Sequence, residues 1–170
     1  MKVWLVSRFP PHKCGVAEYS KNLLDGLAQV HGVEVTAVPV ERFSDALRVA
    51  LRRKPPTLDV IHLQHEFLLY GKPYKSILYF FTMLLALRVT KCHTVLTIHS
   101  LLRRPEAVHA FRNYGFPHAI MLQYTLGRWI HFFLLRLVSC IIVHSEYHAC
   151  GLCADFGVQR WKVRVIPHGV

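Results

Sequence analysis

After Met1 the chain reads Lys2-Val3-Trp4-Leu5-Val6-Ser7-Arg8-Phe9-Pro10-Pro11-His12-Lys13-Cys14-Gly15-Val16, and this segment indicates the fold class of the protein. Its beginning, Lys2–Val6, is a short apolar run that predicts a buried strand. Pro10-Pro11 forbids a helix in the polar loop that follows. From Val16 to Val30 apolar residues recur every three or four positions, which predicts an amphipathic helix. The stretch is therefore a strand, a loop and a helix in succession.

The same alternation of short apolar runs and longer helical patterns continues along the chain. Further strands are predicted at Val33–Val38, Asp59–Leu63, Thr94–Ile98, Cys140–Val143 and Val163–Ile166. Further helices are predicted at Phe43–Leu51, Tyr74–Val89, Ile120–Leu137 and Glu146–Phe156. Runs that are apolar throughout are typical of strands covered on both faces, and strand–helix alternation makes each unit a right-handed crossover. We therefore predict one α/β domain over residues 1–170: a doubly wound, mainly parallel Rossmann-like sheet with helices on both faces.

The composition is that of a folded protein with a basic surface. Of the 170 residues, 52% are hydrophobic and 18% are charged, which excludes a disordered chain. The formal net charge of +11 favours anionic partners such as phosphates, nucleic acid or an acidic membrane face. The five cysteines are an odd number without regular spacing, so we expect reduced thiols in a cytoplasmic protein. No uncharged apolar run reaches the length of a membrane span, roughly 18 residues.

Two apolar segments, Ile77–Leu87 and Ile130–Leu137, lie beside lysines and arginines. An apolar helix edge flanked by cations can dock on anionic headgroups, so peripheral contact with the inner face of a membrane is one expectation. Burial in the core is the other, and the pattern favours it. Nucleic acid is not expected as a partner, because no recognised docking motif is visible and aromatic residues are not interleaved with the basic ones.

The loop after the first strand has the features of an anion site. In a doubly wound sheet the ligand binds at the carboxyl ends of the strands. Here Gly15 stands at the start of a helix beside Arg8, His12 and Lys13, where free N–H groups and the helix dipole favour a phosphate. The alternative, which a single glycine leaves equally open, is that Gly15 only permits a turn. The loop has neither the GxGxxG pattern nor that of a P-loop.

Polar clusters directly follow the third, fourth and fifth predicted strands. They are Gln64-His65-Glu66-Phe67 with Tyr70-Gly71 beyond it, Thr97-Ile98-His99-Ser100, and His144-Ser145-Glu146-Tyr147. A histidine at one strand end is usually structural, but three clusters on one rim favour a binding site. Their mixture of donors and acceptors suits a hydroxyl-rich ligand.

Two other patterns in the sequence, a cysteine pair and the many histidines, do not indicate a metal or redox site. Cys150 and Cys153 have the spacing of a redox or metal-ligand pair, but they fall inside the last predicted helix and no second pair completes a zinc set. The 12 histidines are scattered without a tight ligand spacing. We therefore expect ordinary thiols and no metal site.

Taken together and in order, the loops resemble those of the N-terminal half of a GT-B glycosyltransferase of family 4. The matching stretches are Phe9-Pro10-Pro11, Cys14-Gly15-Val16-Ala17-Glu18-Tyr19, Asn22-Leu23-Leu24, Asp59-Val60-Ile61-His62-Leu63-Gln64-His65-Glu66-Phe67, Tyr70-Gly71, Val95-Leu96-Thr97-Ile98-His99-Ser100, Ile142-Val143-His144-Ser145 and Val165-Ile166-Pro167-His168-Gly169-Val170. The resemblance covers nearly the whole chain. It implies that the sheet is one half of a GT-B fold.

The resemblance also implies roles for individual residues. His99 would approach the donor sugar and the reacting centre, as the catalytic residue. Family members often have two adjacent glycines near the donor diphosphate, and Cys14 stands here in the place of the first. The residues implied to lie near the donor diphosphate are Gly15, Lys13 and Ser145. Those implied on the acceptor side are Arg8, Glu18, Tyr19, His65, Glu66 and Tyr70.

The function implied by the resemblance is transfer of a sugar from a nucleotide-sugar to a hydroxyl of a glycan or lipid acceptor, with retention of configuration. No metal or other cofactor is implied, because helix dipoles and basic side chains stabilise the leaving diphosphate. In the family the segment Ile166-Pro167-His168-Gly169-Val170 leads into a second, donor-binding domain, and that domain is not in this sequence. The chain would then be an acceptor-side half that is inactive alone and pairs with a donor domain, for example a separate chain.

Two other kinds of function stay open. One is a non-catalytic module that captures a glycan or lipid-linked acceptor or docks a catalytic subunit. The other is an adaptor on a membrane surface, which the basic charge would favour.

Overall fold

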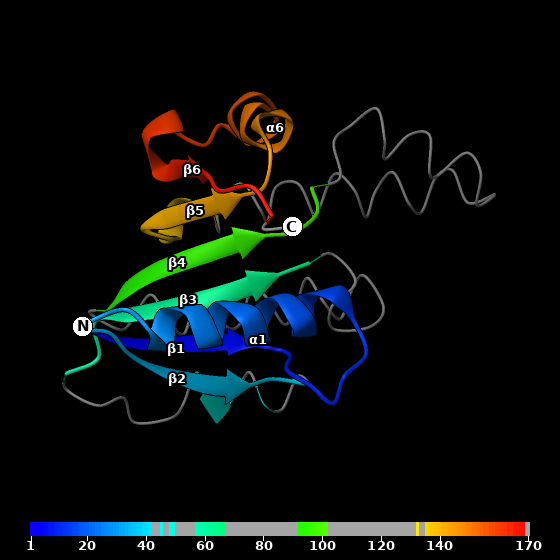
Figure 1. Ribbon diagram of the computed structural model, residues 1–170. Helices are drawn as coiled ribbons and strands as arrows, with labels where there is room; N and C mark the ends of the chain where they lie inside the picture. The colour runs from blue at the N-terminus through cyan, green and yellow to red at the C-terminus, as the bar shows by residue number, and fades with distance from the viewer. Residues whose placement is uncertain are drawn as a thin grey trace.

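The computed structural model describes residues 1–41, 45, 48–49, 57–66, 92–101, 132 and 135–168. Its strands are β1 (Lys2–Ser7), β2 (Glu34–Pro39), β3 (Val60–His65), β4 (His93–Ile98), β5 (Cys140–Val143) and β6 (Val163–Val165). They form a six-stranded sheet in the order β2-β1-β3-β4-β5-β6, and every neighbouring pair is parallel (Figure 1). The predicted parallel, Rossmann-like sheet is confirmed.

The strand order places a topological switch point between β1 and β3. From β1 the chain crosses outward to β2 on one side, and the later strands proceed outward on the other side. Because right-handed crossovers in opposite directions place their helices on opposite faces, the loops after β1 and β3 diverge and leave a crevice between them. The site is therefore expected at the carboxyl ends of these two strands and of β4 beside them.

The central strands are buried because both of their faces are covered. Apolar side chains of β1, β3, β4 and β5 form the core, and those of Leu5, Ile61, Leu63, Leu96 and Ile141 have no exposed surface. By contrast, β2 at the edge of the sheet has exposed and partly buried residues in alternation over its first four positions, and only Val38 is buried. The central strands therefore read as continuous apolar runs in the sequence, as strands of a covered parallel sheet do.

Several predicted strand and helix ends are wrong by one or two residues, and one of these differences matters for the site. The strand predicted at Asp59–Leu63 continues to His65, so that Gln64 and His65 lie inside β3 and not in the loop after it. The reason is the neighbouring strand, because Gln64 pairs with Thr97 and His65 with Ile98 of β4. Both polar side chains are consequently buried.

The described helices are α1 (Gly15–Ala28) and α6 (Glu146–Phe156), with a short 3-10 helix η1 (Arg160–Lys162) before β6. The bounds of α6 are those predicted, because Ser145 caps its first turn and Gly157 ends it in the left-handed conformation. Among the described residues, no helix combines the length and the apolar character that crossing a bilayer requires.

Some sequence predictions lie largely or wholly outside the described residues. These are the helices at Phe43–Leu51 and Tyr74–Val89, most of the helix at Ile120–Leu137, and the apolar segment Ile77–Leu87. Of the third helix, residues 132 and 135–137 are described and helical, and Leu135 is buried in the core.

A buried pair of hydroxyls fixes α1 against the sheet. Ser7 at the end of β1 and Ser20 in α1 are both fully buried, and their oxygens lie 2.6 Å apart. A buried hydroxyl needs such a partner, because leaving it unpaired costs about 1–3 kcal/mol. The bond holds the first turns of α1, including Tyr19 beside Ser20, at the carboxyl end of β1.

Two glycines give a matched test of these helices. Gly157 has φ +62°, and a Cβ there would lie 3.2 Å from the ring of Phe132, whereas a Cβ at Gly26 in α1 would meet no atom within 4 Å. Gly157→Ala is expected to lower the free energy of unfolding by about 1–2 kcal/mol. Gly26→Ala is expected to raise it by about 0.5–1 kcal/mol. Urea denaturation of both variants checks the opposite signs, and equal effects would contradict the described end of α6.

Candidate functional site

A strip of polar side chains runs along β3 and β4 to the carboxyl edge of the sheet. His62 and Gln64 are two residues apart on β3, and Thr97 and His99 are two apart along β4 and its end. Residues at this spacing face the same side of a strand, and the pairing of Gln64 with Thr97 brings the two rows together. His62, Gln64 and Thr97 are buried, and His99 at the end of the strip is partly exposed.

Hydrogen bonds within the strip determine which ring nitrogens carry protons. His99 Nε2 lies 2.7 Å from Gln64 Oε1, and an amide oxygen only accepts, so Nε2 is the protonated nitrogen of His99. The Gln64 amide nitrogen lies 3.4 Å and the Thr97 hydroxyl 2.7 Å from His62 Nε2. His62 Nε2 therefore accepts, and the ring carries its proton on Nδ1. In consequence His99 keeps a lone pair on Nδ1.

Burial keeps both histidines of the strip neutral. It lowers the pKa of His62 to about 4. The pKa of His99 is lowered to about 3, first by burial and then by the neighbouring His144 and His168. A group with a pKa this low is a weak general base near pH 7, because general bases work best when their pKa lies close to the working pH. His99 is thus suited to accepting a hydrogen bond through Nδ1 and poorly suited to removing a proton.

Tyr19 of α1 closes the site from the other side of the crevice. Its ring meets those of His99, His144 and His168 edge to face, with centroids 4.8, 5.3 and 5.3 Å apart. Burial raises the pKa of the Tyr19 phenol, which therefore stays protonated at neutral pH. The sequence placed Tyr19 and His99 in one site, and the structure brings them into contact.

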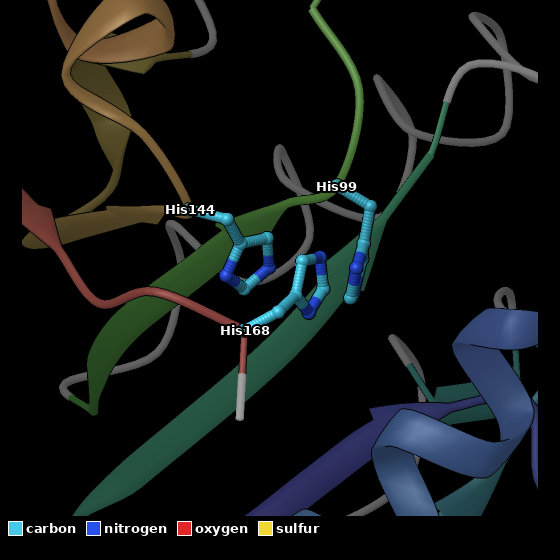
Figure 2. Close-up of side chains that lie close together, drawn as sticks. All are labelled: His99, His144 and His168. Atoms are coloured by element: carbon cyan, nitrogen blue, oxygen red, sulfur yellow. The ribbon is translucent and has the colours of Figure 1, made fainter. Parts of the chain in front are cut away.

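Two further histidines join His99 from the other strands (Figure 2). His144 directly follows β5, and His168 lies three residues beyond β6. Their rings stack with centroids 3.6 Å apart, and His144 Nδ1 donates a hydrogen bond of 2.8 Å to the carbonyl oxygen of Ile166. This bond ties the segment after β6 to the end of β5. Burial lowers the pKa of His144 as well.

The start of α1 is open to a ligand. Cys14 is its N-cap residue, and its side chain makes no capping hydrogen bond. A Cβ on Gly15 would meet nothing within 4 Å, so the backbone is accessible there. Lys13 beside it is exposed. The neighbouring His12 is paired with Glu41, with 3.1 Å between His12 Nε2 and Glu41 Oε1. An anion can therefore approach the helix N-terminus closely.

The remaining predicted site residues differ in how directly they face the site. Ser145 caps α6, accepting a hydrogen bond from the His148 backbone N–H at 3.2 Å. His65 is buried, and its carbonyl oxygen accepts from the His99 backbone N–H at 3.0 Å. Of the others, Arg8 and Glu66 are half-buried and Glu18 is exposed in the first turn of α1, whereas Tyr70 lies outside the described residues.

Sequence reasoning missed His62 and His168 as members of the site, and it included His144 only as part of the polar cluster after the fifth predicted strand. His62 reads as part of a buried strand, and only the pairing of β3 with β4 brings it to Thr97. His144 and His168 follow two strands that turn out to be neighbours in the sheet. The signal available was their common position at carboxyl ends. Cys150 and Cys153 lie within α6 as predicted, and their thiols are free.

Comparison with known proteins identifies the family. A family model described as Glycosyltransferase Family 4 matches residues 14–170. No curated protein matches the chain. The matched region begins one residue before α1 and contains Tyr19, His99, His144 and His168. Because it makes up most of the sequence, the chain belongs to glycosyltransferase family 4, as a domain of the N-terminal GT-B type.

Proposed function

We propose that this chain is the acceptor-side half of a retaining glycosyltransferase, which transfers a sugar from a nucleotide-sugar to an acceptor hydroxyl of a glycan or lipid. The observation that carries the proposal is the contact of Tyr19 with His99 at the carboxyl edge of β4, across the crevice beside β1 and β3. Membership of glycosyltransferase family 4 supports sugar transfer as the reaction.

In this proposal His99 binds a hydroxyl of the transferred sugar. Its Nε2–H donates a hydrogen bond to Gln64 Oε1, so Nδ1 is the ring atom that can still accept a hydrogen bond from a hydroxyl. A neutral ring held by a buried partner fixes that hydroxyl without reorganisation, which places the reacting carbon relative to the acceptor. His99 is therefore a catalytic residue through contact with the substrate and not through proton transfer.

The donor diphosphate is proposed to lie at the N-terminus of α1. The accessible backbone at Gly15, the absence of a side-chain cap from Cys14 and the nearby exposed Lys13 support an anion there. Positive ends of helices and basic side chains stabilise a leaving diphosphate electrostatically. We therefore propose that the transfer step itself proceeds without a metal ion. The proposed acceptor side comprises Arg8, Glu18, Tyr19, His65, Glu66 and Tyr70.

One domain alone is expected to catalyse transfer poorly, because the cleft that orients the two substrates and stabilises the leaving diphosphate is proposed to lie between two domains. The chain alone is accordingly proposed to be inactive and to need a donor domain. The free thiols of the cysteines suit a reducing, cytoplasmic compartment. A net charge of +11 suits an acceptor presented at an anionic membrane surface.

A transfer assay tests the proposal. The purified 170-residue chain is incubated with UDP- and GDP-sugars and a panel of acceptors, alone and joined to a family 4 donor domain. We expect no transfer by the chain alone and transfer by the joined protein. Robust turnover by the chain alone would refute the half-cleft proposal. Acceptor binding without transfer in the joined protein would instead favour a non-catalytic module.

A further inference from the structure

Three histidines at the carboxyl edge have the arrangement of metal ligands. His99, His144 and His168 each offer one ring nitrogen, and the three atoms lie within 4.8 Å of one another. The residues come from the ends of β4 and β5 and from the segment after β6, so sequence spacing does not reveal them (Figure 2). Imidazole is the commonest protein ligand for Zn²⁺ and similar cations.

In two of these rings, one nitrogen already donates a hydrogen bond to a carbonyl oxygen. His99 Nε2 donates to the side-chain oxygen of Gln64 at 2.7 Å, and His144 Nδ1 donates to the backbone oxygen of Ile166 at 2.8 Å. Histidines that bind metals almost always donate their second N–H in this way, which fixes the tautomer and the ring orientation. Each ring is thereby left with a lone pair on its other nitrogen.

The remaining nitrogen of His144 needs a partner. His144 Nε2 is buried and has no hydrogen-bond partner among the described residues. Leaving a buried acceptor unsatisfied costs about 1–3 kcal/mol, so an unpaired nitrogen beside two other imidazoles calls for an explanation. A cation among the three rings would supply the missing partner.

We propose that His99, His144 and His168 bind a divalent transition-metal cation, with Zn²⁺ as its representative. Three nitrogens on a tetrahedral zinc are about 3.3 Å apart, so the three nitrogens need to close by at most about 1.5 Å. The stacked rings of His144 and His168 also need to turn, so that both lone pairs point at one cation. His168 is exposed on the segment after β6, and movement of this segment can supply the closure. Three protein ligands leave the fourth position open to water or to a ligand.

The cation site does not depend on the proposed sugar transfer. It uses the same lone pair of His99 that a sugar hydroxyl would use, so cation and sugar exclude each other at this atom. The measurement of binding therefore uses the 170-residue chain without any sugar. Failure of the cation site leaves the transfer proposal untouched, and the reverse also holds.

Calorimetric titration of the chelator-treated chain with ZnCl₂ tests the proposal. We expect one Zn²⁺ per chain, and we expect His144→Ala and His168→Ala each to weaken the Kd by at least about tenfold. His168 is exposed, so His168→Ala is expected to fold normally. His93→Ala is the matched control, because His93 is exposed at the opposite end of the strand that leads to His99, and it is expected to keep the wild-type Kd.

A second variant excludes the thiols as the ligands. The double variant Cys150→Ser/Cys153→Ser is expected to bind Zn²⁺ as the wild type does, and Co²⁺ in the wild-type chain is expected to show no thiolate charge-transfer absorption. The proposal is overturned if the wild type takes up no Zn²⁺. It is overturned equally if the cysteine variant loses binding while His168→Ala retains it.

Discussion

His99→Gln is expected to lower the rate of sugar transfer by the joined protein about 10²-fold, whereas His99→Asn is expected to lose much less. The reason lies in which ring nitrogen each amide replaces. Asparagine places an amide oxygen near the position of Nδ1, the acceptor proposed for the sugar hydroxyl, while glutamine reaches toward Gln64 and leaves that position empty. Loss of one preorganised hydrogen bond at a reacting centre typically costs 10²–10³-fold.

Initial rates with saturating acceptor measure this difference. His93→Ala serves as the control, since it changes the same strand at its other end and is expected to leave the rate unchanged. Urea denaturation of each variant separates loss of folding from loss of chemistry. Equal losses for asparagine and glutamine would contradict the assignment of Nδ1 as the hydrogen-bond acceptor.

Acidification is expected to destabilise the protein through His62. Burial lowers the pKa of His62 to about 4 from its ordinary 6.5, so between these values the unfolded chain binds the proton and the folded chain does not. The free energy of unfolding therefore falls as the pH is lowered from 6.5 to 4, by about 1.4 kcal/mol per pH unit and up to about 3 kcal/mol in all. Above pH 6.5 the contribution of His62 is constant.

The variant His62→Gln isolates this contribution. Glutamine can accept from the Thr97 hydroxyl near the position of Nε2 but does not titrate. Urea denaturation of both proteins at several pH values, with a chelator present, is expected to give a shallower pH dependence for the variant. Identical slopes from pH 6.5 to 4 would show that His62 is not held neutral in the folded protein.

The sheet could be predicted from the sequence because its signals are local. Cys140–Val143 was predicted to the residue, since a short β-branched run is bounded by polar residues. The same is true of α6, where Ser145 and Gly157 are recognisable caps. The end of β3 was misplaced because Gln64 and His65 are polar, and only pairing with β4 buries them.

The site could be predicted only in part. Tyr19 and His99 were expected in the site because the resemblance to the family implies it, and His99 also lies in a polar cluster at the end of a predicted strand. The sequence also placed the cluster that contains His144 on the same rim as His99, whereas the position of His168 beside them depends on the pairing of β6 with β5 in the folded sheet. The neutral state of His99 likewise depends on burial and on Gln64, a residue from another strand.

The central claim is that a sugar binds at the carboxyl edge of the sheet, against Tyr19 and His99. NMR of the chain labelled with ¹⁵N in its histidine rings, titrated with acceptor glycans and nucleotide-sugars in the presence of a chelator, tests it most directly. We expect the ring signals of His99 and His144 to shift on ligand addition, while those of His93 and His31 stay in place. Shifts confined to His93 or His31, or none at any histidine, would contradict the account.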